Sequence, residues 1–228
     1  MGQHYLSTLF SPKSVAIIGA SDRADSVGAI VFKNMLESGF KGKLYPVNPN
    51  HKKIQGKRAY ATIEEIGKPV ELAVICTHAA SVPDVIEACG KHGVRAAVVL
   101  SAGFSEVGAH GAEIERTMLA NAKTYGVRII GPNCLGIMRT AIGLNATFFK
   151  GNIKPGKLAL VSQSGALCTA ILDWAPANDI GFSSVVSMGT SADVDFGEIL
   201  DYLASDPQTE SILIYVEGIH KARGFMSA

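Results

Sequence analysis

Short apolar runs alternate with stretches of helical period along the first 130 residues. The run Ser14–Ile18 is rich in β-branched residues and ends at Gly19, which is typical of a buried strand. Val27–Leu36 carries apolar residues at helical spacing and stops at Ser38-Gly39, so it predicts a helix. The same pattern predicts further strands at Lys43–Val47, Leu72–Cys76, Ala96–Leu100 and Arg128–Ile130, and further helices at Val82–Lys91 and Ala109–Tyr125.

Continuous apolar strands that are separated by helices indicate a parallel sheet covered on both faces. We therefore predict a Rossmann-like, doubly wound α/β domain that occupies residues 1–150. In such sheets, ligands bind beyond the carboxyl ends of the strands. The loops that deserve inspection are therefore those that follow the predicted strands, at 19–27, 47–53, 76–82, 101–106 and 131–136.

The pattern restarts after residue 150. The polar segment Asn152–Lys157 contains Pro and Gly and predicts a linker. Beyond it we expect three strands and three helices: strands at 158–161, 183–187 and 212–216, and helices near 166–177, 196–204 and 221–228. These form a second, smaller α/β domain over 151–228. Because the last predicted helix runs to the final residue without a C-cap, we expect the chain to be the front part of a longer protein.

Composition excludes several classes of protein. A chain that is 47% hydrophobic and 18% charged is not a disordered protein. Its net charge of +1 argues against a nucleic-acid binder, but the charge is unevenly distributed. Residues 1–58 hold nine Lys or Arg against three acidic residues, a net +6, and the remaining residues sum to −5. The basic first quarter predicts an anionic ligand in that region.

The four cysteines form no C-x-x-C pair and no metal-binding spacing, which favours a reduced, cytoplasmic chain without a metal site. No apolar run approaches the roughly 18–20 residues of a membrane span. The N-terminus also lacks the basic and apolar regions of a signal peptide. We therefore expect no membrane partner.

The first loop departs from a dinucleotide-binding fingerprint, because Ser21 stands where the second Gly of G-x-G-x-x-G is expected. After the second strand, Asn48-Pro49 and then Lys52 and Lys53 replace the acid that usually meets the ribose of NAD. Amide and ammonium groups suit an additional ribose phosphate. These residues therefore predict either NADP or coenzyme A (CoA) as the ligand.

Several segments together carry a resemblance to a known family. They are GASDRADSVGAI, LYPVNPNHKKIQG, LAVICT, VLSAGFSEVG, RIIGPNCLGI, GLNATF, LALVSQSGAL, SMGTSADVDFGEILDYLASDPQT and ILIYVEGI. In this order they resemble the nucleoside-diphosphate-forming acyl-CoA synthetases, which include ADP-forming acetyl-CoA synthetase and are similar to the succinyl-CoA synthetase α subunit. The order GPNCLG, SQSG, DVDF is the most specific part, and the likeness covers nearly the whole chain.

The resemblance implies a CoA-binding Rossmann-like domain followed by a truncated flavodoxin-like domain. It implies an acid–thiol ligase that interconverts acyl-CoA, ADP and phosphate with acid, CoA and ATP through an acyl phosphate and a phosphohistidine. That histidine lies in a loop downstream of the EGI motif, and ATP, ADP and Mg²⁺ belong to an ATP-grasp module. The expected partners are therefore CoA or acyl-CoA and an ATP-grasp module, in the same chain or in a β subunit. The chain alone is expected to bind CoA without turnover, and a homo-oligomer is left open.

The resemblance also assigns roles to residues of this sequence. It implies that CoA is bound by a set of residues that extends from its nucleotide to its thiol. They are Ser21, Val27, Gly28, Asn48, Pro49, Lys52 or Lys53, Thr77, Ser101, Ala102, Gly103, Pro132, Asn133 and Cys134. Ser162, Gln163, Ser164 and Gly165 would form a phosphate-binding loop, which also suits the start of a helix. Glu217 would be the carboxylate that orients the phosphohistidine. Thr190 and His78 depart from the family pattern, which commonly has Asn and Pro there.

Other functions fit part of the pattern. Some relatives fuse these domains to a GNAT acetyltransferase, in which the synthetase part is regulatory, and the residues present do not separate this reading from a ligase. An NADP-dependent oxidoreductase is the third reading, disfavoured by Ser21 and Asn48.

Single residues also have a structural and a functional interpretation. We interpret Cys134 as a packing residue rather than a nucleophile, and Trp174 as core. Asp193 and Asp195 are expected to cap a helix rather than to bind metal. Glu106 fits a contact to CoA and a solvated loop acid equally well. Ser164 lies in no G-x-S-x-G elbow, which disfavours a hydrolase.

Overall fold

The computed structural model describes residues 4–151, 153–219 and 221–228. The first sheet has five parallel strands, β1 (Ser14–Ile18), β2 (Lys43–Val47), β5 (Leu72–Ile75), β6 (Ala96–Val99) and β7 (Arg128–Ile130), in the order β2-β1-β5-β6-β7. All five residues of β1 are buried, as a strand covered on both faces requires. The predicted parallel sheet is therefore confirmed, with strand ends that differ by at most one residue.

Helices cover this sheet where the periodicity predicted them. They are α2 (Val27–Glu37), α3 (Val82–Lys91) and α4 (Ala109–Tyr125), with short 3-10 turns η1 (Glu64–Ile66), η2 (Ala79–Ser81) and η3 (Ser105–Val107). The Ser26 hydroxyl caps α2 by accepting from Ala29 N, and Gly126 ends α4 in the left-handed conformation. A small hairpin of β3 (Lys53–Ile54) and β4 (Lys57–Arg58) follows β2.

The second sheet combines parallel and antiparallel pairs. Its parallel strands are β10 (Pro155–Ser162), β11 (Phe182–Ser187) and β12 (Ser211–Tyr215). Two earlier strands extend it in antiparallel fashion: β8 (Gly136–Arg139) pairs with β11, and β9 (Leu144–Thr147) pairs with β8, which gives the order β12-β10-β11-β8-β9. The predicted segment 1–150 thus contributes two strands, at 136–147, to the second sheet. β10 also begins at Pro155, inside the predicted linker, of which Asn152 lies outside the described residues.

The remaining elements pack around the second sheet. They are α5 (Gly165–Trp174), η5 (Pro176–Asn178), α6 (Phe196–Ala204), α7 (Ala222–Ser227) and the turn η4 (Thr140–Ile142). Trp174 is 57% exposed at the end of α5, so its assignment to the core is wrong. Pro176 comes two residues later and starts a 3-10 turn, which explains why α5 is shorter than the predicted helix.

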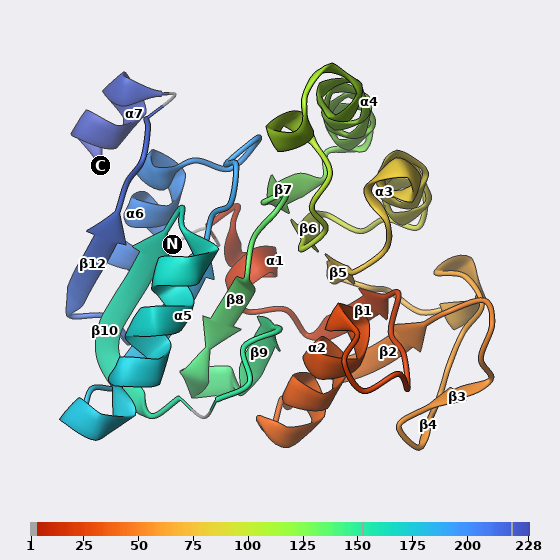
Figure 1. Cartoon of the computed structure of the whole chain (residues 1–228), viewed down its shortest axis with the longest axis horizontal. Coiled ribbons are helices and arrows are strands. Elements are labelled where there is room, and N and C mark those ends of the chain that lie inside the picture. The colour runs from red at the N-terminus through yellow and green to blue at the C-terminus, as the bar shows by residue number, and fades with distance from the viewer. Residues whose placement is uncertain (1–3, 152, 220) are drawn as a thin grey trace.

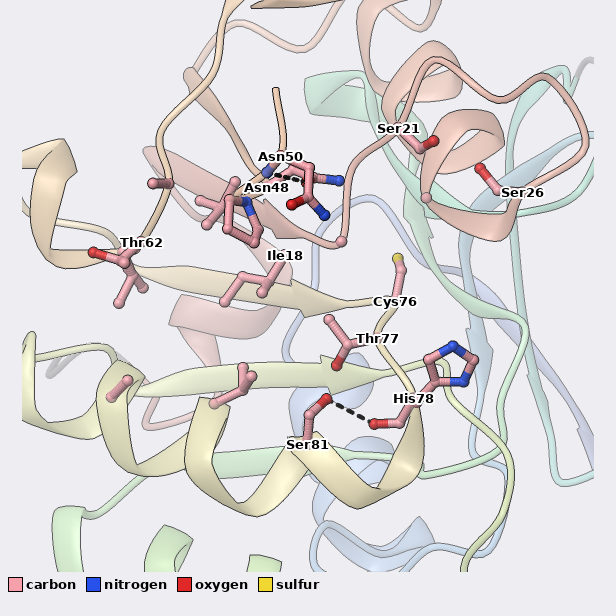
Figure 2. Close-up of a pocket in the computed structure, with 18 of the residues that line it drawn as sticks. Ile18, Ser21, Ser26, Asn48, Asn50, Thr62, Cys76, Thr77, His78 and Ser81 are labelled. Carbon is pink, nitrogen blue, oxygen red and sulfur yellow. Dashed lines mark hydrogen bonds between the residues drawn. The ribbon is translucent and has the colours of Figure 1, made fainter. Parts of the chain in front are cut away.

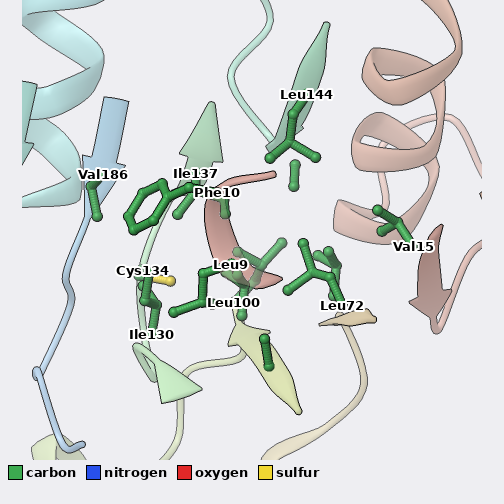
Figure 3. Close-up of a cluster of buried hydrophobic side chains, with 14 of the residues drawn as sticks. Leu9, Phe10, Val15, Leu72, Leu100, Ile130, Cys134, Ile137, Leu144 and Val186 are labelled. Atoms are coloured by element: carbon green, nitrogen blue, oxygen red, sulfur yellow. The ribbon is translucent and has the colours of Figure 1, made fainter. Parts of the chain in front are cut away.

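One contiguous apolar core joins the two sheets. The short helix α1 (Ser7–Phe10), which the sequence pattern did not reveal, lies between them in Figure 1. Its residues Leu9 and Phe10 are fully buried, and Figure 3 shows them among Leu72 and Leu100 of the first domain and Ile137 of the second sheet. The two domains therefore pack against each other through one common apolar core. None of the helices formed by the described residues has both the length and the apolar character needed to cross a membrane.

Candidate functional site

A cavity of about 830 Å³ opens at the carboxyl ends of β1, β2 and β5, and we call it the outer cavity. The chain order reverses between β1 and β5, so the cavity lies at the topological switch point of the sheet. Its wall includes Gly19, Ser21 and Ser26–Gly28 after β1, Asn48–Asn50 after β2, and Thr77 and His78 after β5. Of these, Ser21, Ser26, Asn48, Asn50, Thr77 and His78 are labelled in Figure 2. Three of the predicted ligand loops thus meet here.

The loop after β1 lies directly on the first turn of α2. A Cβ on Gly28 would lie 1.9 Å from Gly19 O, and Gly19 itself has a φ of +87°. Only a residue without a side chain allows this approach. The free N–H groups of the first α2 turn are thereby brought to the cavity wall, where they suit a phosphate group.

Asn48 holds the loops of β1 and β2 together. Its Nδ2 donates to Ala20 O at 2.8 Å, and its Oδ1 accepts from Asn50 N at 2.9 Å. The predicted residues Asn48 and Pro49 both line the outer cavity, but the Asn48 amide is already engaged in shaping its wall.

The two predicted lysines lie elsewhere. Lys52 and Lys53 are exposed at the start of the β3–β4 hairpin and are not among the residues that line either cavity described here. Gln55 docks this hairpin on the loop after β1, because its N donates to the Asp22 carboxylate at 2.7 Å and its Nε2 to Ala29 O at 2.9 Å. The basic side chain that does line the outer cavity is Arg23, which we did not predict, although it is the one base in the Gly19–Gly28 loop.

A second cavity, of about 900 Å³, lies between the two domains, and we call it the junction cavity. Thr77 and His78 line both cavities, so the outer and junction cavities are adjacent. Ser101 and Ala102 contribute to its wall as predicted, whereas Gly103 is absent from the residues that line it. His78 is exposed in the predicted ligand loop 76–82 after β5, although no contact to CoA was assigned to it.

Glu106 has a structural partner in the same loop. Its carboxylate accepts from Gly103 N at 2.6 Å and from Phe104 N at 3.1 Å while the residue lines the junction cavity. These bonds hold the 103–106 turn in shape. The carboxylate is therefore more than the solvated loop acid that the sequence allowed.

The SQSG segment forms the other side of the junction cavity. Ser164 is the N-cap of α5, and its hydroxyl accepts from Leu167 N at 3.2 Å. Gln163, Ser164 and Gly165 line the cavity, so the positive end of the helix dipole faces it. Ser162 is fully buried and its hydroxyl donates to Ser164 O at 2.9 Å, which leaves it outside the residues that line the cavity.

Gln163 connects this loop to the end of β12. Its Oε1 accepts from Glu217 N at 2.6 Å and from Gly218 N at 3.0 Å, and its Nε2 donates to Gly218 O at 3.1 Å. Because the chain order of the second sheet reverses between β10 and β12, these residues lie at the switch point of that sheet. The exposed Glu217 thereby becomes part of the junction cavity wall.

The GPNC turn closes the cavity from the first domain. Asn133 is exposed in the cavity wall, whereas Pro132 is buried and its carbonyl accepts from Thr190 N at 3.1 Å. Cys134 also lines the cavity, but it is only 3% exposed, and burial raises the pKa of its thiol to about 12. Burial and the raised pKa of the thiol both disfavour the reactive thiolate, in agreement with the interpretation of Cys134 as a packing residue.

The acids of the DVDF motif are structural. Asp195 is the N-cap of α6, where its carboxylate accepts from Glu198 N at 3.1 Å within a reciprocal capping box. Asp193 accepts from Arg128 Nε at 3.0 Å and from Ile129 N at 2.8 Å. The capping interpretation is thus confirmed for Asp195. Within the described ranges, no three His, Cys, Asp or Glu side chains are grouped as metal ligands.

Two family models match the chain. Residues 13–140 match the model described as a CoA binding domain, and residues 155–228 match the succinyl-CoA ligase like flavodoxin domain. The chain is 45% identical over 221 residues to the ADP-forming acetate–CoA ligase I of Archaeoglobus fulgidus, and 44% identical over 225 residues to the α subunit of the corresponding Pyrococcus furiosus ligase I. Each alignment covers 97% of this chain, but 32% and 49% of the relatives, so the chain spans about a third to a half of their length.

Solved structures agree with these relationships. A Pyrococcus horikoshii protein superposes with a TM-score of 0.94 at 43% identity, over 97% of this chain and 51% of that chain. The dinucleotide-forming acetyl-coenzyme A synthetase 1 of Ca. Korarchaeum cryptofilum, solved with phosphate and ADP, also gives 0.94, at 40% identity over 97% of this chain and 48% of that chain. The sequence-based assignment of fold and family is therefore confirmed.

Proposed function

This chain belongs to the family of CoA-binding domains that continue into a succinyl-CoA ligase-like flavodoxin domain, and we propose that it is the CoA-binding part of an ADP-forming acid–CoA ligase. The observation that carries the proposal is that the outer and junction cavities are adjacent, with Thr77 and His78 in the walls of both. An elongated ligand with a nucleotide at one end and a reactive group at the other fits this arrangement. CoA has that shape, and the acid most relatives named above act on is acetate.

The outer cavity is the proposed site of the nucleotide half of CoA. The first turn of α2, opened by Gly28, supplies N–H groups to the diphosphate. The Asn48–Asn50 turn borders the adenosine. The 3′-phosphate is assigned to Lys52 or Lys53, where it would extend beyond the cavity wall toward the hairpin, and Arg23 is the cation that lines the outer cavity itself.

The junction cavity is the proposed site of the thiol end and of phosphate. The pantetheine passes Thr77, Ser101 and Ala102 and brings the sulfur to Asn133 and Cys134. In the proposed reaction the CoA thiolate attacks the acyl carbon of an acyl phosphate, the carbon–oxygen bond to phosphate breaks, and inorganic phosphate leaves. Gln163–Gly165 at the start of α5 stabilise the phosphate charge through N–H groups and the helix dipole. Cys134 packs against this site and takes no covalent part.

The rest of the proposed ligase is not part of residues 1–228. ATP, ADP and Mg²⁺ bind the ATP-grasp module, in the same polypeptide or in a β subunit, as the α-subunit relatives from Pyrococcus furiosus suggest. Glu217 is assigned to orient the phosphohistidine that this module phosphorylates. A cytoplasmic location and a homo-oligomer stay predictions.

The two alternative functions have no comparable support. None of the relatives named above is an acetyltransferase or an oxidoreductase. The family match over 13–140 favours CoA over NADP as the ligand.

Titration calorimetry with CoA, dephospho-CoA and NADP tests the proposal. We expect CoA to bind with micromolar-range affinity, dephospho-CoA to bind about tenfold more weakly because it lacks one charge-assisted contact, and NADP not to bind. Absence of CoA binding would contradict the proposed function.

A charge-matched pair of double variants then tests the lysines. K52A/K53A should bring the CoA affinity down to that for dephospho-CoA. K41A/K43A removes the same charge at the amino end of β2, the end of the strand opposite to the outer cavity. This variant should preserve the difference in affinity between CoA and dephospho-CoA. If K52A/K53A still prefers CoA as strongly as the unmodified chain, the 3′-phosphate role of these lysines is wrong and Arg23 is the next residue to replace.

A further inference from the structure

Thr190 occupies a fixed position in the wall of the junction cavity. It follows β11 in the turn 188–191, and its N donates to Pro132 O at 3.1 Å, while Ala192 N donates to Gly131 O at 3.1 Å. A Cβ on the preceding Gly189 would lie 2.1 Å from Pro132 O, so the two turns are in direct contact. The backbone of Thr190 is therefore held between the first domain and the second sheet, and its hydroxyl reaches the cavity by rotation about the Cα–Cβ bond.

The hydroxyl of Thr190 is different from most of the polar groups around this cavity. Thr169 Oγ1 donates to Gly165 O at 3.0 Å, Ser164 caps α5, and the Gln163 amide and the Glu106 carboxylate are engaged with backbone groups. Thr190 Oγ1 is buried, and within the described part of the chain it has no hydrogen-bond partner, a property that it shares in this cavity wall with Thr77 Oγ1 on the pantetheine path. A buried hydroxyl without a partner is costly, so its retention at a cavity wall indicates that a ligand supplies the bond.

We infer that Thr190 Oγ1 donates a hydrogen bond to the carbonyl oxygen of the acyl group at the thiol end of CoA. The inference rests on the proposed function, which brings this end into the junction cavity beside Asn133 and Gln163–Gly165. A thioester carbonyl is an acceptor only, and the threonine hydroxyl rotates to donate to it. The free thiol of CoA offers only a weak acceptor. Thr190 is therefore a residue that distinguishes acyl-CoA from CoA.

Calorimetry of Thr190→Val with acetyl-CoA and with CoA tests this role. Valine keeps the shape and removes the hydroxyl. We expect the acetyl-CoA affinity to fall about threefold to tenfold, which corresponds to one neutral hydrogen bond, while the CoA affinity stays within twofold. Thr190→Ser keeps a hydroxyl and should retain most of the acetyl-CoA affinity. Thermal unfolding of unliganded T190V should occur at the same temperature or higher, because an unpaired buried hydroxyl is lost.

The matched control is Ser184→Ala. The Ser184 hydroxyl is also buried without a partner in the described residues, but it lies within β11 and lines neither cavity. This variant should bind both ligands as the unmodified chain does.

The possible outcomes distinguish an error in the role of Thr190 from an error in the proposed function. Equal losses for CoA and acetyl-CoA in T190V, or no loss for either, would overturn the role of Thr190 while the proposed CoA site stands. A lowered unfolding temperature together with equal losses would assign Thr190 a structural role. Failure of the unmodified chain to bind CoA would contradict the proposed function, and this inference with it.

Discussion

Gly28 illustrates how a single residue determines what the outer cavity can hold. The loop after β1 passes so close to the start of α2 that Gly19 O occupies the space of a Gly28 side chain, with 1.9 Å between that oxygen and a Cβ. The N–H groups at this helix start are accessible to a ligand because no side chain intervenes. The same contact makes the position intolerant of even a methyl group.

Gly28→Ala should therefore damage both stability and binding. We expect a loss of about 2 kcal/mol in the free energy of unfolding, since backbone must move to admit the methyl group, and at least a tenfold loss of CoA affinity. Urea unfolding and calorimetry measure the two effects. Gly224→Ala in α7 is the control, because a Cβ there would meet nothing within 4 Å. Wild-type stability of G28A would show that the loop relaxes and that the steric argument is wrong.

At the scale of elements, α6 connects the DVDF motif to the core. Its start is fixed by the capping box of Asp195 and Glu198, and its buried face presents Ile199, Tyr202 and Leu203 to the apolar core that joins the two sheets. The Tyr202 ring stacks on Phe10 of α1, with 4.4 Å between the ring centroids. The capped start of α6 therefore sets the positions of the side chains that hold the two domains together.

Asp195→Ala should cost about 1 kcal/mol of unfolding free energy, the usual value of an N-cap. Asp195→Asn should cost much less, because an amide oxygen still accepts from Glu198 N. Urea unfolding of the two variants distinguishes the cap from the ion pair with Lys221, whose Nζ lies 3.2 Å from Asp195 Oδ2. Equal destabilisation by Ala and Asn would mean that charge, rather than the cap, stabilises α6.

At the scale of the whole molecule, Arg128 at the start of β7 binds the second domain. Its guanidinium lies 3.0 Å from the Asp193 carboxylate and 2.8 Å from that of Glu198. Partial burial disfavours the charged form, but hydrogen bonds to both acids hold the pKa of Arg128 above its usual value. Tyr5 completes the cluster, since its hydroxyl donates to Glu198 and its ring lies beneath the guanidinium. Residues from the N-terminus, β7 and α6 thus meet at one interdomain contact.

Arg128→Ala should lower the unfolding free energy by about 2 kcal/mol, because two partly buried acids lose their partner. Arg116→Ala is the control: Arg116 pairs with Glu113 on the exposed surface of α4, and its loss should cost under about 0.5 kcal/mol. A double-mutant cycle of R128A with Asp193→Ala measures the coupling between the two side chains. Additive losses in that cycle would show that the ion pair does not join the domains.

The strands of the parallel sheet were predictable because both of their faces are buried. A run such as Ser14–Ile18 is then apolar at every position, which is a local signal. β8 and β9 carry no such signal, since they pair with each other and β8 joins the sheet by pairing with β11, a strand far along the chain. The residue type of Trp174 predicts a position in the core, but the residue is exposed at the end of α5. A side chain's environment depends on the orientation of its element, which a periodic pattern does not specify.

The sequence by itself determined the family, the strands of the parallel sheet and the loops that line the outer cavity, because these follow from local burial patterns and from motif order. The tertiary structure decided which of the loop residues meet. In the folded chain, Thr77 and His78 line both cavities, whereas Lys52 and Lys53 lie outside the cavity walls. Ser162 and Asn48 make internal hydrogen bonds. The tertiary structure also left the Thr190 hydroxyl without a partner in the described part of the chain. These properties depend on distances between segments far apart in the chain, which only the packing of two sheets against each other sets.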